Sequence, residues 1–433
     1  MIFICFFLVL CSPDQQNMAG IISTDIKSLL TIAVKSRSDG FTDQFNRIYM
    51  VKMLLVCSMI MGLSWFKDSI KCIVPEHTEM EGDFVAAACW IQGLYVYREM
   101  MSRTSDAGYF GIPKDIGMNG LTPKGTLCRT VDQFGKVMPK EECMPMSKTF
   151  YLQYQYMPFY VAALTIVYYL PYIFYTQVNT DLSSLKSTMK EDSDDEEKAR
   201  KIVKHYFHVK GRQRRSMAIR VLLNILSKVV YILANVIALY GTDSILNGEY
   251  TRFGQRFVSW ATEPNSRQYS YMGMNHRVRA GDALLPSFGY CEMWESLMDK
   301  LHAKANQHKF VCELSQNVLY QYCLIVMWMM IILALMFSII GLIMLLMHYV
   351  LSVCVVRKQG IIPSKLYASL NFREIEYLYF ARKKSIPLFD HMVSELKRVR
   401  FSDGVQMNGL EETAPLYSPP PIPPPSDMKK PPY

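Results

Sequence analysis

Two long runs without any charged residue constrain this chain more than any other feature. Residues 314–347 and 149–180 contain no Asp, Glu, Lys or Arg. A helix of about 20 apolar residues already crosses the hydrocarbon core of a bilayer. A buried helix in a soluble domain would not need this length. Both runs are therefore predicted to form transmembrane helices.

Two further segments complete a predicted set of four spans. Residues 48–66 are apolar except for Lys52, and residues 219–241 contain Arg220 and Lys228. Lys52 and Arg220 lie near the ends of their segments, where long basic side chains can reach the membrane interface. Lys228 lies deeper, so we expect it to face either a charged partner or a water-filled path.

The distribution of basic residues predicts the orientation. Four spans place both termini on one side together with the middle loop, 181–215, which holds ten Lys and Arg residues. The long loops 67–148 and 242–313 hold only ten and eight, although each is about twice as long, and Lys and Arg favour the cytoplasmic side. We therefore expect the termini and the middle loop in the cytoplasm.

The basic residues alternate with acids and no zinc-finger spacing occurs, so the net charge of +9 does not indicate a nucleic-acid partner.

Six of the eleven cysteines lie in the two long loops. They are Cys72, Cys89, Cys128, Cys143, Cys291 and Cys312. An even number of cysteines confined to one side of a membrane indicates disulfides in an oxidising compartment. A zinc site is the alternative, but the chain has no CxxC pair and no histidine at a suitable spacing.

Several short motifs near the predicted spans are distinctive. The second span begins with YQYMPF at 154–159, and the loops contain KCIVPEH at 71–77, ACWIQ at 88–92 and a cysteine ahead of ELSQNVLYQY. Together they resemble innexins, the invertebrate gap-junction proteins, over about residues 24–350. The family motif at the second span reads YQWVPF, so Tyr156 takes the position of its tryptophan. The first loop is longer than is usual in innexins.

The resemblance implies a set of site residues and an assembly. The family pairing of its loop cysteines implies disulfides Cys72–Cys312 and Cys89–Cys291. Cys128 and Cys143 are additional, and we expect them to pair with each other across an insertion at about 100–145. The resemblance also implies a ring of eight subunits around an aqueous pore, which docks through its extracellular loops on a ring in the apposed cell.

The two prolines of the second span, Pro158 and Pro171, leave structural alternatives open. A proline inside a helix removes a backbone hydrogen bond and kinks the helix, whereas a proline in the first turn is tolerated. Either role fits Pro158. Pro171 lies deeper, so we expect it to mark a kink or the cytoplasmic end of the helix.

The cytoplasmic segments contain candidate regulatory features. Ser193 precedes a run of acids, which is typical of an acidic-directed kinase site, although a solvated charge run would look the same. The Pro-rich end of the tail is typical of polyproline II and could bind an SH3-type partner or remain a plain flexible tail. We interpret residues 1–17 as an extension ahead of a start at Met18.

The sequence thus predicts an all-α membrane protein that acts as a structural subunit of gap junctions in the plasma membrane. It has no GxSxG, P-loop or HExxH motif, so neither an enzyme nor a bound cofactor is expected. An undocked hemichannel and a four-span adhesion or scaffold protein are the alternatives. Homomeric or heteromeric assembly, permeant size, gating stimulus and tissue stay open.

The predicted segments are a cytoplasmic N-terminus (1–47), the first span (48–66), an extracellular loop (67–148), the second span (149–178), a cytoplasmic loop (179–218), the third span (219–241), an extracellular loop (242–313), the fourth span (319–350) and a cytoplasmic tail (351–433).

Overall fold

The computed structural model divides into two compact units. The first comprises Met1–Lys186 and Ser216–Leu351, and the second Ser187–Arg215 and Ser352–Tyr433. The structure describes residues 40–67, 70–75, 80–103, 105–131, 136–191, 194–207, 211–262, 280–298, 303–358, 362, 366–367 and 370–406. Ser193, residues 1–17 and the Pro-rich end of the tail lie outside the described residues.

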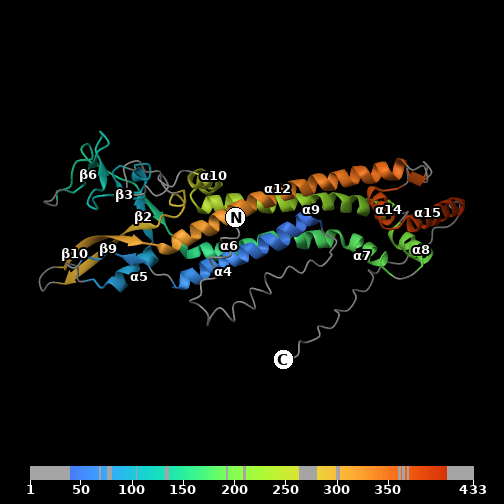
Figure 1. Ribbon diagram of the computed structural model, residues 1–433, viewed down its shortest axis with the longest axis horizontal. Helices are drawn as coiled ribbons and strands as arrows, with labels where there is room; N and C mark the ends of the chain where they lie inside the picture. The colour runs from blue at the N-terminus through green and yellow to red at the C-terminus, as the bar shows by residue number, and fades with distance from the viewer. Residues whose placement is uncertain are drawn as a thin grey trace, which may run out of the picture. The chain divides into compact units, whose positions relative to one another are not determined.

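Four long helices form the body of the first unit, and Figure 1 shows them running side by side. Among the described residues, the segments long and apolar enough to cross a membrane are Phe41–Trp65, Gln153–Val178, Arg215–Ile245 and Ser315–Arg357. They belong to α3 (Phe41–Gln44) with the π-helix η2 (Phe45–Met50) and α4 (Val51–Lys67), to α6 (Gln153–Val178), to α9 (Gly211–Ile245) and to α12 (Ser315–Lys358). Each of the four predicted spans thus falls on a helix that is long and apolar enough to cross a membrane. The helices extend beyond the apolar runs; α12 continues past residue 347 because no Gly or Pro follows before Gly360.

The core between these helices follows from helical periodicity. On α4 and its preceding turn the buried side chains recur every three or four residues, and the same spacing recurs on α6, so each helix presents one apolar stripe to its neighbours. The stripe of the first span is Met50, Leu54, Cys57 and Met61, and the stripe of α6 is Tyr154, Met157, Val161, Leu164 and Tyr168.

The outer faces of the long helices carry large apolar side chains that are exposed in the part of the chain that the structure describes. Ile166, Leu222 and Met344 are each about two-thirds exposed, at 64%, 65% and 65%. Such a surface would drive aggregation in water. In a bilayer it is stable against lipid or against another subunit.

A five-stranded antiparallel sheet lies at one end of the long helices, the end at which α4 terminates. Its strand order is β1-β10-β9-β2-β8, and the strands come from both long loops. They are β1 (Lys71–Cys72), β2 (Leu94–Tyr97), β8 (Lys148–Tyr151), β9 (Phe288–Met298) and β10 (Ala303–Glu313). Two helices accompany the sheet, α5 (Gly82–Gln92) and α10 (Tyr250–Ala261). The chain is mostly helical, but the sequence pattern did not indicate these strands, because β1, β2 and β8 are too short to show a period.

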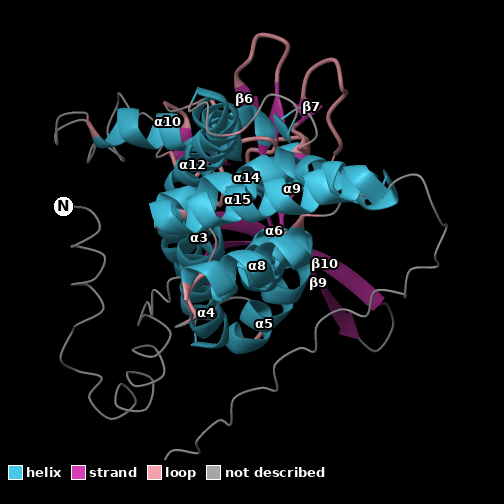
Figure 2. Ribbon diagram, turned by 90° about the vertical axis from the view of Figure 1, so that its right-hand side faces the viewer, coloured by secondary structure: helices cyan, strands magenta, loops and turns pink. Residues whose placement is uncertain are grey.

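The insertion in the first loop forms two smaller sheets beyond a short 3-10 turn, η3 (Arg98–Met100). One sheet pairs β3 (Ala107–Tyr109) with β4 (Ile112–Pro113). The other has the order β6-β5-β7, with β5 (Gly120–Leu121), β6 (Leu127–Cys128) and β7 (Met144–Pro145). Figure 2, viewed along the helices, shows that β6 and β7 and the β9–β10 hairpin project on different sides of the first unit.

The second unit is built around α8 (Asp195–Tyr206), α14 (Phe372–Lys384) and α15 (Ile386–Gln406). Asn371 and Glu374 form a capping box that fixes the start of α14. Next to it, Arg373 and Glu376 form a buried ion pair at 2.8 Å. Tyr206 at the end of α8 packs edge-on against Tyr377. A further short helix, α7 (Thr180–Thr188), follows α6.

Candidate functional site

The five-stranded sheet joins the two long loops through two disulfides. One links Cys72 on β1 to Cys312 on β10, which are directly paired across the strands. The other links Cys89 on α5 to Cys291 on β9 and so fastens the helix to the sheet. Because both bonds cross between loops, the loops form a single covalently linked layer. A crosslink that closes a long stretch of chain restricts the unfolded state strongly.

The insertion carries its own crosslink. Cys128 on β6 is bonded to Cys143, which precedes β7, and the bond closes a stretch of only 15 residues. Both cysteines belong to the first loop, so this disulfide does not tie the loops together. It stabilises the small sheet locally and leaves the inter-loop link to the other two bonds.

An aromatic and charged cluster covers one face of the five-stranded sheet. Lys148 forms an ion pair with Glu292 at 2.6 Å, and the Lys309 ammonium lies 3.7 Å from the centre of the Tyr290 ring. Burial lowers the pKa of Lys309 to about 8, although Glu292 opposes the shift. Burial alone would raise the pKa of Glu292, but hydrogen bonds from Lys148 and Tyr95 outweigh it, so that its pKa is lowered.

In the YQYMPF motif at the start of α6, the residues that bond to the rest of the subunit are Tyr154 and Gln155, and not Tyr156, which was singled out from the sequence. Tyr156 is 43% exposed and points away from the core of its own subunit. Tyr154 is fully buried, and its hydroxyl donates a 2.7 Å hydrogen bond to the carbonyl of Trp90 on α5. The Gln155 amide donates to the same carbonyl at 2.6 Å. The motif thus connects the second span to the disulfide-linked sheet.

Both prolines of α6 lie inside the helix and are buried. Pro158 is the sixth helical residue, past the first turn, and its carbonyl accepts a 2.9 Å hydrogen bond from Ser58 on α4. The helix continues for seven residues beyond Pro171 to Val178, so Pro171 does not mark the helix end. The interhelical bond at Pro158 shows how the backbone of α6 recruits a neighbouring helix.

Lys228 faces a charged partner. Its ammonium forms an ion pair with the carboxylate of Asp43 in α3, and the two residues are 7% and 3% exposed. The ring of Tyr175 lies 5.7 Å from the ammonium. Lys52 is half-buried in α4. We expected Lys228 to face either a charged partner or a water-filled path, and in the structure it faces a charged partner.

A second group of buried polar side chains forms a hydrogen-bonded network inside the bundle. The amide of Asn235 on α9 donates to the Asn46 side chain at 2.9 Å and accepts from the Tyr168 hydroxyl at 2.9 Å. Asn46 also donates to the hydroxyl of Ser338 on α12 at 2.9 Å. These four side chains come from four different helical segments, so the network links all four spans. Polar groups in an apolar bundle favour such shared bonds.

The π-helix at the start of the first span directs two polar residues inward. Asn46 and Arg47 are both buried in η2, and the Arg47 guanidinium lies 4.1 Å from the centre of the Tyr172 ring on α6. A π-helical turn widens the backbone and is often found at functional positions. Here it brings adjacent residues into the same interior. The first span is therefore fixed to α6, α9 and α12 at its beginning.

Neither Asp43, the partner of Lys228, nor the network residues Asn46, Tyr168 and Ser338 were identified from the sequence. Asp43 and Asn46 precede the apolar run that was used to set the start of the first span. Their spacing of three residues places them on one helical face, and this was an available signal. Ser338 is a single small polar residue in a long apolar run, a pattern common in membrane helices.

The chain was compared with known proteins. The family model for innexins matches residues 39–396, which is most of the chain. No curated protein matches the chain. The matched region includes the four spans, the three disulfides and the buried polar network.

Proposed function

Because this chain belongs to the innexin family, we propose that it is a structural subunit of gap junctions, whose channels pass ions and small molecules between adjacent cells. Innexins are channel proteins that form oligomers in membranes, and the chain is accordingly a multi-pass membrane protein and not an enzyme. In this proposal eight subunits form a ring in the plasma membrane, and the ring docks on a second ring in the adjacent cell.

The observation that carries the proposal is the sheet shared by the two loops. Two inter-loop disulfides hold strands from both loops in one layer at one end of the spans. A preorganised surface loses little freedom when it binds a partner. Exposed apolar side chains on this layer, Ile73 at 71% and Trp294 at 66%, are typical of a protein-binding surface.

The proposed assembly uses the uncovered faces of the helices. Part of that apolar surface would contact neighbouring subunits of the ring, and the rest would contact lipid. The charge distribution along the sequence supports a cytoplasmic position for the termini and for the second unit. The disulfides support an extracellular position for the sheet, because such bonds persist in oxidising compartments.

Two measurements, made one after the other, test the proposal. Images of the purified full-length protein should show rings of eight subunits around an open axis. Paired cells that both express the protein should pass current between them, whereas an undocked hemichannel would conduct only across the membrane of a single cell. Small closed oligomers without conductance would contradict the channel proposal and favour an adhesion protein.

A matched pair of variants separates docking from assembly. Trp294→Glu places a charge on the sheet and should abolish current between paired cells while rings still form. Ile386→Glu changes an equally exposed apolar residue, at 67%, in the second unit and should leave the intercellular current intact. Equal currents in Trp294→Glu and in the unmodified protein would exclude this face of the sheet from docking.

A further inference from the structure

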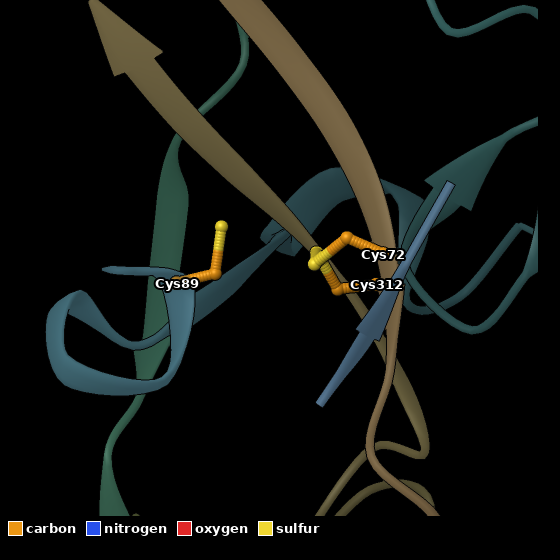
Figure 3. Close-up of side chains that lie close together, drawn as sticks. All are labelled: Cys72, Cys89 and Cys312. Carbon is orange, nitrogen blue, oxygen red and sulfur yellow. A yellow bond between two sulfur atoms is a disulfide. The ribbon is translucent and has the colours of Figure 1, made fainter. Parts of the chain in front are cut away.

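The two inter-loop disulfides lie close to each other. The sulfur atoms of Cys72, Cys89 and Cys312 all lie within 4.8 Å of one another. Figure 3 shows these three side chains, with the bond between Cys72 and Cys312. Three thiolates at this distance could bind a metal ion, but each of these sulfurs is already part of a disulfide. Two disulfides this close can instead exchange partners once a single thiolate is present.

The exposure of the four cysteines determines where an external thiol can enter. Cys72 is half-buried, whereas Cys89, Cys291 and Cys312 are at most 1% exposed. An incoming thiolate can therefore reach the Cys72 sulfur and displace Cys312. The displaced Cys312 thiolate forms in the interior, within 4.8 Å of the Cys89 sulfur.

We propose that these four cysteines form one thiol–disulfide exchange site for a low-molecular-weight thiol. In the first step the external thiolate bonds to Cys72, the Cys72–Cys312 bond breaks, and Cys312 takes the electron pair. In the second step Cys312 bonds to Cys89, the Cys89–Cys291 bond breaks, and Cys291 leaves as a thiolate that takes a proton from water. One thiol enters and one thiol appears, and the number of disulfides stays at two. The sequence therefore needs neither an oxidant nor a reductant.

The geometry favours this direction of exchange. Cys291 is not part of the close group of sulfurs, although it is bonded to Cys89. Cys89 is thus the sulfur that the Cys312 thiolate meets, and Cys291 is the leaving group. Thiolate attack on a disulfide proceeds through the sulfur that is accessible to it.

The exchange would change the link between the first span and the sheet. The new Cys89–Cys312 bond still joins the two loops, but Cys72 on β1 is released from β10. Among the described residues, β1 is paired with β10 at Lys71 with Glu313 and at Cys72 with Cys312, and the next residue, Ile73, donates a 3.0 Å hydrogen bond to the Val311 carbonyl of β10. Because β1 follows α4 in the chain, the end of the first span would gain freedom while the rest of the sheet stays crosslinked.

Trapping of the exchanged state in the unmodified full-length protein tests the proposal. Membranes are treated briefly with glutathione, quenched with acid, alkylated with N-ethylmaleimide and mapped by mass spectrometry. We expect glutathione on Cys72, N-ethylmaleimide on Cys291 and a new Cys89–Cys312 peptide in place of Cys72–Cys312. Alkylation of Cys312 together with an intact Cys89–Cys291 peptide would overturn the proposal, because it shows opening without exchange.

The third disulfide provides an internal control. Cys128 is half-buried and Cys143 is 2% exposed, so this bond has the same pattern of exposure as Cys72–Cys312. Among the described residues it has no third cysteine within 4.8 Å of both its sulfurs. We expect it to give glutathione and N-ethylmaleimide on its own two cysteines and no crossed peptide. Crossed peptides between this bond and the others would indicate unspecific scrambling and contradict a built site.

Two single variants test, without added thiol, whether the Cys89 and Cys312 sulfurs can form a bond with each other. In Cys291→Ser the Cys89 thiol is free beside Cys72–Cys312, and exchange should distribute the free thiol between Cys89 and Cys72. In Cys143→Ser the free thiol should stay on Cys128. A free thiol found only at Cys89 would refute the exchange. If Cys291→Ser does not fold, the trapping experiment on the unmodified protein decides alone.

Discussion

The ion pair between Lys228 and Asp43 gives the sharpest test of how the bundle is held together. The substitution Lys228→Met removes the ammonium group and leaves the buried Asp43 carboxylate without this positive charge beside it. Breaking a buried pair in this way costs about 3–5 kcal/mol, because the remaining charge stays out of water. The double variant Asp43→Asn with Lys228→Met removes both charges and should recover most of that loss.

An exposed ion pair of the same unit supplies the control. Arg129 and Asp115 are 2.9 Å apart, and their side chains are 45% and 47% exposed. Arg129→Met should therefore change the free energy of unfolding by about 0–1 kcal/mol. Both single variants replace a basic residue of an ion pair by Met, and the two pairs differ strongly in burial.

The assay is a titration of each variant with sodium dodecyl sulfate in mixed lipid micelles, followed by circular dichroism. We expect the midpoint of Lys228→Met to fall well below that of Arg129→Met. If the two midpoints coincide, and if Lys228→Cys reacts with a water-soluble methanethiosulfonate, Lys228 faces water and the structural role assigned to the pair is wrong.

Two further predictions concern the first unit outside this pair. At Gly254 on α10, an added Cβ would lie 2.2 Å from the Trp328 ring, so Gly254→Ala should destabilise the protein by about 1–3 kcal/mol. Gly62→Ala meets no atom within 4 Å and serves as its control, with thermal midpoints as the measurement. For Lys309, the lowered pKa of about 8 means that the unfolded chain binds more protons above this pH, so stability rises between about pH 8 and pH 9.5. In Lys309→Met this rise should disappear, and an unchanged rise would refute the assignment to Lys309.

The spans could be predicted from the sequence because a bilayer imposes a requirement that one segment satisfies alone. A helix needs only length and apolar composition to cross the membrane. The ends of the helices are set differently. The first span begins at Phe41, ahead of its apolar run, because Asp43 and Asn46 have buried partners on other helices. Composition gives no sign of those partners, since they lie far away in the chain.

The sheet illustrates the same limit in the loops. Strands β1 and β2 contain two and four residues, too few to show an alternating pattern. They are strands because β9 and β10 of the other loop offer free edges and because disulfides hold the partners together. Pairing across about 200 residues costs considerable loop-closure entropy, and the crosslinks offset part of it. The number of cysteines in the loops indicated disulfides, but the short distance between two of these disulfides depends on a register that only the folded sheet provides.

The position of the polar network has a consequence for how a subunit could respond as a unit. The network fixes the beginning of the first span, and the disulfide-linked sheet holds the segment that follows its end. A helix held at both ends transmits a displacement along its length more directly than a free one, because packed helices do not deform continuously. Release of β1 from β10 would remove the hold at one end and leave Asp43, Asn46 and Arg47 in place at the other. A change in the loop disulfides would therefore alter the tilt of the first span before it alters the packing of α6, α9 and α12.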